Sequence, residues 1–235
     1  MNAASFLDRW QAYLPALLQG AGMTLVVSAS AIVLGFMLGA VLLGLSLRGR
    51  GPLRRAVAGY VGFFRGTPLL VQLLMLFYLP SAFGLDLPPL LVAILVMSMN
   101  SGAFQSEILR AGLAAVPPGQ VEAGVIFGLS RHQVFRYVQL PQVARAVWPA
   151  VVSEAIDVVK NSSIVSVIAV AELARAGRQI ASANFRPLEV YLSVGALYLL
   201  MTGAIFVLGS WLGRRLGQGR RASAAVMNRM AINKT

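Results

Sequence analysis

The sequence predicts an all-α integral membrane protein with five transmembrane helices. Composition is the first observation behind this prediction. Of the 235 residues, 57% are hydrophobic and only 12% are charged, whereas soluble domains carry about 25% charged residues. Mean hydropathy is +0.74. The second observation is that the apolar residues fall in runs close to the roughly 20 residues that a spanning helix needs.

Five apolar runs mark the expected spans. The first is the clearest, because residues 10–47 contain no charged side chain. The fourth is broken by Glu154, Asp157 and Lys160. The spans are expected at about 20–47, 66–85, 87–110, 146–171 and 190–213.

Basic residues predict the orientation, because basic loops stay in the cytoplasm. The linker after the first span, the segment after the third span and the C-terminal tail are rich in arginine. The N-terminus is therefore expected outside and the C-terminus in the cytoplasm. One loop disagrees, since Arg175, Arg178 and Arg186 precede the fifth span on the expected outer side. Residues 1–217 form one transmembrane domain, and 218–235 a basic tail that is disordered or lies on the lipid surface.

Composition also argues against several functions. The chain has no cysteine and a single histidine, His132, so it offers neither a thiolate site nor a histidine cluster for a metal. The net charge of +12 does not indicate nucleic-acid binding, because the basic residues punctuate apolar runs and do not gather on one face. A membrane enzyme would need a nucleophile with its base, and a secondary transporter usually shows an internal repeat, which is not evident.

Small residues recur in the first span. Gly35 and Gly39 are four residues apart, and Gly44 follows. Such spacing lets helices approach closely, although the ordinary glycine content of membrane helices explains it equally well.

The segment 118–141 is too polar and too interrupted to span a membrane. Two prolines suit the start of a first helix, and Gly128 suits its C-terminal cap. A Ser-x-x-Gln capping box begins a second helix at Ser130, and Leu140-Pro141 is expected to end it. The result is a rigid elbow of two short helices, suited to a groove on a partner; the alternative is an amphipathic helix on lipid headgroups.

The same segment resembles the EAA motif of ABC importer permeases, which reads Glu-Ala-Ala, three residues, Gly, nine residues, Ile-x-Leu-Pro. The matching positions are Glu122-Ala123-Gly124, Gly128 and Val138-Gln139-Leu140-Pro141. Further stretches resemble the polar amino acid uptake branch: "FRGTPLLVQLLMLFYLP", "NSGAFQSEILRAGL" and "SEAIDVVKNSSIVSVIAVAEL". The resemblance runs from about residue 20 to 213 and implies the type I ABC importer permease fold, whose EAA segment is a cytoplasmic coupling helix.

The resemblance implies the membrane subunit of an ATP-driven importer in the bacterial cytoplasmic membrane, without catalytic residues. Neither lysine, Lys160 or Lys234, follows a glycine, so the chain lacks a P-loop. ATP and magnesium would bind to a separate ATPase dimer that docks on the EAA helix, where Glu122 and Gly128 transmit its closure. A second permease subunit, identical or related, and an external solute-binding protein would complete the importer. A polar amino acid is the implied cargo, with an opine or another small polar metabolite as the alternative.

Ionisable groups inside a membrane are candidates for the substrate pathway. Glu154, Asp157 and Asn161 share one helical face, and Asn100 and Glu107 share another. The two faces could line a cavity in which Glu154 and Asp157 receive an ammonium group. The family often has aspartate where Asn161 stands, which argues against a specifically cationic cargo.

Each candidate has a structural alternative, and some importers of the family have no substrate site in the membrane. Asp157 can pair with Lys160, and Glu107 with Arg110. Gln72 is either a pathway residue or a hydrogen bond between helices. Five aromatic residues lie near span ends or lipid faces, and most of them are expected to be interface anchors: Phe77, Tyr78, Tyr191, Tyr198 and Trp211.

Overall fold

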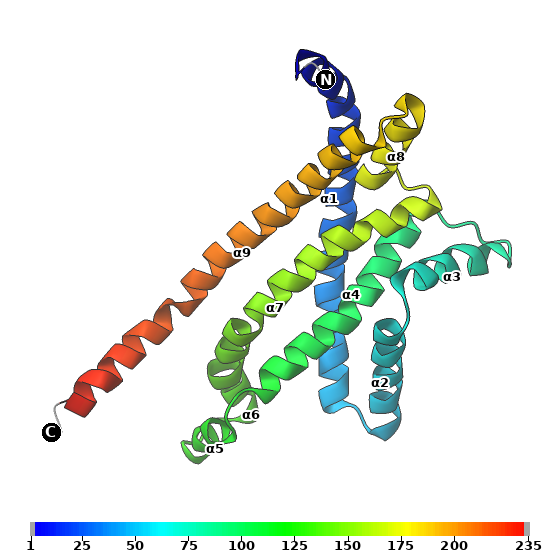
Figure 1. The fold of residues 1–235 in the computed structure, drawn as a ribbon. Coiled ribbons are helices and arrows are strands. Elements are labelled where there is room, and N and C mark those ends of the chain that lie inside the picture. Colours follow the sequence, from blue (N-terminus) through cyan, green and yellow to red (C-terminus); the bar gives the residue numbers. More distant parts are fainter. Residues whose placement is uncertain (1–2, 233–235) are drawn as a thin grey trace. The chain divides into compact units, whose positions relative to one another are not determined.

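The computed structural model describes the backbone of residues 3–232 and the side chains of residues 10–217, and the described backbone is helical without strands. The elements in chain order are α1 (Ala3–Arg48), α2 (Gly51–Gly66), α3 (Leu69–Ser81), α4 (Pro89–Ala114), α5 (Pro118–Ile126), α6 (Arg131–Gln133), the π-helical η1 (Val134–Gln139), α7 (Leu140–Asn161), the 3₁₀ turn η2 (Ser162–Ile168), α8 (Leu173–Asn184) and α9 (Pro187–Ile232) (Figure 1). The chain divides into two compact units. One runs up to Glu107 and resumes over Glu154–Gly203, and the other comprises Ile108–Ser153 and the chain from Ala204 onward.

Three helices of the described chain are long and apolar enough to cross a membrane. They are Trp10–Arg48 within α1, the whole of α4, and Pro187–Gly217 within α9. The pair formed by α2 and α3 also qualifies if it is one bent span. α7 does not qualify, because charged residues recur along it. The span at 146–171 therefore stays a prediction.

The second span, expected at 66–85, starts at a sharp bend. Residues Gly51–Gly66 already form α2, and the chain bends by 109° before α3. Thr67 and Pro68 are both extended at the bend, since proline disfavours helix in the residue before it. The 13 residues of α3 reach about 20 Å, less than the roughly 30 Å of a hydrocarbon core. α3 alone is too short to cross.

Two of the three predicted glycines bring α1 against α4 in the first unit. A Cβ atom on Gly35 would lie 2.9 Å from the Cβ of Ser101, and one on Gly39 would lie 2.6 Å from the Cβ of Gln105. Carbon atoms pack at about 3.5–4.0 Å, so any larger residue would separate the helices. Gly44 has open space around it and does not serve this role.

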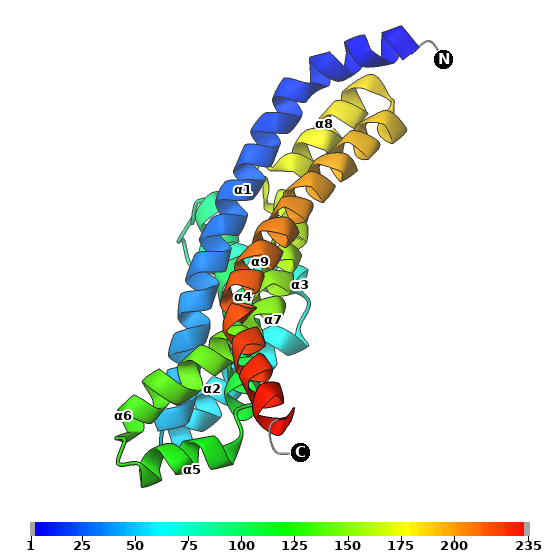
Figure 2. The same ribbon diagram turned by 90° about the vertical axis from the view of Figure 1, so that its left-hand side faces the viewer.

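The second unit holds the elbow between α4 and α7. Figure 2 shows α5 running one way and the α6–η1 stretch returning beside it. In the same unit α7 packs on α9, where the indole Nε1 of Trp148 donates to the carbonyl of Gly209 at 2.7 Å. A Cβ on Gly209 would lie 2.6 Å from Val152, so this contact also requires glycine.

The basic tail at 218–235 lies outside the residues whose side chains are described. Its backbone continues α9 as helix to Ile232. Helix α9 therefore has no break at residue 217, where the sequence places the end of the transmembrane domain.

Candidate coupling elbow and polar pathway

The joint of the elbow is built by a glycine turn, as predicted. Gly128 has φ +80°, a left-handed conformation that glycine adopts without steric cost. The N–H of Gly128 donates to the carbonyl of Val125 at 2.9 Å, and that of Leu129 to the carbonyl of Gly124 at 3.1 Å. This is the hydrogen-bond pattern of a Schellman motif, which satisfies the last carbonyls of a helix. α5 therefore ends at a fixed angle.

The second arm of the elbow starts with the predicted capping box. The Ser130 hydroxyl accepts from the N–H of Gln133 at 3.3 Å, and the Gln133 side chain accepts from the N–H of Ser130 at 2.8 Å. Gly124 is buried, and a Cβ there would lie 3.1 Å from Val134. The arms are thus in contact at Gly124, the position where the family pattern has alanine.

Leu140 and Pro141 do not end the second helix, which is a correction to the sequence prediction. The helix passes from α6 through η1 into α7 without a break. Proline lacks an N–H and its ring needs room beside the carbonyl four residues back. The backbone makes that room by widening, since the N–H of Leu140 donates to the carbonyl of Phe135, five residues back. Single π turns of this kind accommodate such local strain.

A side-chain hydrogen bond that the sequence did not predict, here called the brace, joins α5 to the start of α7. The amide Nε2 of Gln142 donates to the Oε1 of Gln120 at 2.6 Å and to the carbonyl of Val138 at 2.8 Å. Gln120 belongs to α5 and Gln142 to α7. No sequence signal marks this pair, because the partners are 22 positions apart and glutamine is common on helix surfaces.

The outer side of the elbow is exposed and partly apolar. Glu122 and Gly128 are exposed, and Ala123 is half-buried. Next to them, Ile126 is 83% and Phe127 86% exposed. Large apolar side chains gathered on a surface indicate a contact site. The EAA pattern names neither of these two residues, so the sequence did not predict them.

In the first unit, Gln72 and Asn100 meet at the bend between α2 and α3. The Gln72 amide donates to the carbonyls of Phe64 and Thr67, both at 2.9 Å. The Asn100 amide donates to the Phe64 carbonyl at 3.1 Å and to the Gln72 side chain at 3.0 Å. Carbonyls at a helix end lack helical partners, and these two amides supply them. Gln72 therefore makes the interhelical hydrogen bonds that were one alternative for it.

Glu107 faces α2, on the same side of α4 as Asn100. Its Oε2 lies 3.5 Å from the Nη1 of Arg65. The Arg65 guanidinium also lies 5.5 Å from the ring centroid of Phe104. Together these contacts hold α2 beside α4.

The three candidates on α7 differ in their surroundings. Asp157 pairs with Lys160 at 2.6 Å, and both side chains are more than half exposed. The ion pair that the sequence allows for Asp157 is therefore present. Asn161 is exposed. Glu154 is half-buried and lies near Ser101 of α4. The buried Ser101 hydroxyl forms no hydrogen bond of good geometry within the described chain.

Glu172 is a buried carboxylate that sequence reasoning missed. It is 0% exposed and begins α8, accepting from the N–H groups of Ala174 at 2.8 Å and Arg175 at 2.7 Å. The Tyr198 hydroxyl donates to it at 2.8 Å, and the Thr24 hydroxyl lies 3.5 Å away. Helices α1, α8 and α9 meet at this carboxylate.

This cluster gives Tyr198 a partner inside the protein, which the sequence did not predict. An acidic residue at the start of a polar helix is a possible N-cap, and that signal alone could have pointed to Glu172. Its tyrosine and threonine partners, 26 and 148 positions away in the chain, carry no such signal. Among the described residues no three histidine, aspartate or glutamate side chains come together as a metal site.

Apolar helices long enough to cross a membrane, with a polar elbow between α4 and α7, are the architecture of a membrane transport subunit. The family described as binding-protein-dependent transport system inner membrane component matches residues 31–221, and the chain belongs to this family. It is 36% identical over 210 residues to the glutamine transport system permease protein GlnP of Escherichia coli (strain K12), covering 88% of this chain and 95% of GlnP. It is 32% identical over 204 residues to the arginine transport system permease protein ArtQ of Bacillus subtilis (strain 168), covering 86% and 93%.

Solved structures agree with these relatives. A crystal structure of an amino acid ABC transporter with histidines is 35% identical, has a TM-score of 0.84 and covers 89% of this chain and 98% of that chain. The fold is thus that of type I ABC importer permeases. The chain is a transport subunit whose relatives are amino acid permeases.

Proposed function

We propose that this chain is the permease subunit of an ATP-driven importer that carries a polar amino acid across the bacterial cytoplasmic membrane. The elbow carries the proposal. Its glycine turn and capping box fix its shape, and Ile126 and Phe127 stand exposed beside the EAA positions. The relatives named for glutamine and arginine transport support an amino acid as cargo.

The energy of ATP hydrolysis would reach this chain through its contact with an ATPase subunit. The sequence has no Gly-x-x-x-x-Gly-Lys motif, so ATP and magnesium belong to a separate ATPase dimer. That dimer docks on the elbow through Glu122, Ala123, Gly124 and Gly128. No nucleotide, metal or other cofactor binds to this chain.

The elbow is suited to pass a rigid movement to α7. The Gln120–Gln142 brace ties α5 to the first turn of α7, and α7 is one continuous helix from Leu140 to Asn161. ATPase closure that shifts the elbow therefore pulls on the helix that carries Glu154. Leu140 and Pro141 contribute the π turn that sets the direction of the pull.

The remaining pathway candidates take two roles in this proposal. Glu154, Asp157 and Asn161 form the polar face of α7 that a solute passes, with Glu154 and Asp157 receiving its ammonium group. Gln72, Asn100 and Glu107 hold the bent α2–α3 pair beside α4 and so shape the pathway. A second permease subunit would close the pathway, and an external solute-binding protein would deliver the solute.

Reconstitution tests this function. The chain is placed in proteoliposomes with its ATPase and its binding protein, and uptake is measured for a panel of amino acids and opines. ATP-dependent uptake that ceases without the ATPase is the expected result. Uptake driven by an ion gradient alone would assign the chain to the secondary transporters, and uptake of opines only would change the cargo.

A further inference from the structure

The loop between α7 and α9 carries three arginines, although the expected orientation places this loop outside the cytoplasm. The structure gives these arginines different surroundings. Arg186 is compensated, because its Nη1 lies 3.4 Å from the Oε1 of Glu189. Arg175 and Arg178 stand on α8, and neither forms an ion pair within the described part of the chain. Uncompensated arginine outside the cytoplasm is unusual in membrane proteins, so these two positions call for a functional reason.

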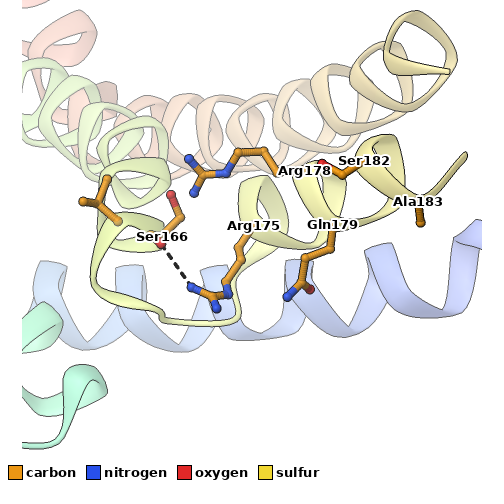
Figure 3. Close-up of a pocket in the computed structure, with 7 residues that line it drawn as sticks. Ser166, Arg175, Arg178, Gln179, Ser182 and Ala183 are labelled. Carbon is orange, nitrogen blue, oxygen red and sulfur yellow. Dashed lines mark hydrogen bonds between the residues drawn. The ribbon is translucent and has the colours of Figure 1, made fainter. Parts of the chain in front are cut away.

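Arg175 and Arg178 line an open groove between α8 and η2. Its volume is about 770 Å³, and its wall consists of Ser166, Val167, Arg175, Arg178, Gln179, Ser182 and Ala183. Figure 3 shows both arginines reaching from α8 toward the turn that carries Ser166. The Nη1 of Arg175 donates to the Ser166 carbonyl at 3.4 Å, which steadies that side chain and leaves its other N–H groups available.

The groove offers hydrogen-bond donors and positive charge without an acid. Each guanidinium presents five N–H donors in a planar fork that matches a carboxylate. The N-terminus of α8 takes no part, since the buried Glu172 already occupies its N–H groups. The chemistry therefore selects a small anionic group.

We propose that the α8–η2 groove binds the carboxylate of the transported solute on the outer side of the importer. This inference rests on the proposed function and adds a solute class to it. A neutral or acidic amino acid brings a carboxylate without excess positive charge, whereas a cationic amino acid is repelled by both guanidiniums. The groove thus favours neutral and acidic solutes. Asn161 stands where the family often has aspartate, and it likewise argues against a specifically cationic solute.

Calorimetry on the permease–ATPase complex in nanodiscs, without binding protein, tests the groove. The probes are L-glutamine, L-glutamate, L-arginine and L-glutaminamide, which lacks the α-carboxylate. We expect glutamate and glutamine to bind, and arginine and glutaminamide to bind at least tenfold more weakly. Arg175→Gln and Arg178→Gln should each weaken glutamate binding about tenfold, as the loss of a hydrogen bond to a charged group does, and added salt should weaken it further.

Arg186→Gln is the matched control, because it removes the same charge from the same loop outside the groove; it should leave binding within twofold. Glutaminamide binding as well as glutamine, absence of glutamate binding to the wild type, or full glutamate binding by the Arg175→Gln, Arg178→Gln double variant would each overturn the proposal.

Two further measurements separate this inference from the proposed function. If wild-type proteoliposomes show no ATP-dependent amino acid uptake, the proposed function itself fails. If uptake is normal and the double variant binds glutamate like the wild type, only the groove assignment fails. A double variant that keeps glutamate binding but loses stimulation of ATP hydrolysis by the binding protein would make the groove a docking surface for acidic side chains of that protein, which also overturns the solute assignment.

Discussion

At the scale of single residues, the elbow depends on one left-handed position. Gly128 alone supplies the turn between α5 and α6, and its neighbours Ile126 and Phe127 are held outward by that turn. A side chain with a Cβ atom pays about 1–2 kcal/mol in this conformation. The angle between the two arms is therefore sensitive to a change that removes no contact at all.

We expect Gly128→Ala to lower ATP-coupled uptake several-fold, and Gly128→Asp or Glu122→Arg to abolish coupling while the protein still inserts. The substitutions at Gly128 would displace the docking surface of the elbow, and the charge reversal at Glu122 would repel the ATPase. Uptake, ATP hydrolysis and co-purification of the ATPase are measured together. Gly119→Ala is the control, because Gly119 lies within α5 with open space around it. Normal uptake and normal ATPase capture by all three variants would refute the role of the elbow.

The buried carboxylate is a second residue-scale feature. We expect Glu172→Gln to lower the free energy of unfolding by about 2 kcal/mol, because two backbone N–H groups and a tyrosine lose a charged acceptor. Tyr198→Phe should cost about 1 kcal/mol, since it removes one hydrogen bond. Thermal unfolding of the detergent-solubilised protein measures both. Tyr191→Phe, at an exposed tyrosine, serves as the control, and equal melting temperatures for all three variants would contradict the cluster.

At the scale of elements, glycine sets the distance between α1 and α4. We expect Gly39→Val to destabilise the protein and lower its melting temperature, because its Cβ would meet Gln105 at 2.6 Å and the backbone of Ser106 at 2.9 Å. Gly44→Val has free space and should be tolerated. Melting temperature and the yield of monodisperse protein report the difference. If both substitutions behave alike, the two helices do not depend on close approach.

Local chemistry explains which elements the sequence could predict. The Gly128 turn and the Ser130 capping box involve residues three to five positions apart, so their patterns are visible in the chain. The bend at Thr67 depends on side chains of α3 and α4, whereas the passage through Pro141 depends on a local widening of the helix. Amides of Gln72 and Asn100 satisfy the bend, and a π turn absorbs the proline. The sequence predicts a helix end at Pro141, because the π turn that lets the helix continue has no signature in the sequence.

The same limit applies to the candidate site. Helical spacing correctly placed Asn100 and Glu107 on one face of α4, and it allowed the Asp157–Lys160 pair. It could not indicate that the face of Asn100 and Glu107 is turned toward α2, because this depends on which helix packs there. The sequence likewise shows the three arginines between α7 and α9, whereas the groove that Arg175 and Arg178 line is visible only in the fold.

At the scale of the whole molecule, the orientation in the membrane connects the proposals. The elbow must face the cytoplasm to receive an ATPase, and the α8 groove must face outward to meet a solute. The arginine-rich loops favour this arrangement by the positive-inside rule, and the arginines of α8 oppose it. A direct measurement is needed, because the coupling role and the groove both fail if the orientation is reversed.

The chain has no cysteine, so single introduced cysteines report orientation without background. We expect Ser182→Cys on α8 to react with a membrane-impermeant maleimide in intact cells, and His132→Cys on α6 to react only after the membrane is opened. Both positions are exposed in this chain, so burial within the chain does not prevent labelling. The denatured proteins are labelled as the control for reactivity. Labelling of His132→Cys from outside, with Ser182→Cys protected, would reverse the topology. It would place the elbow where no ATP is available and the groove where no external solute arrives.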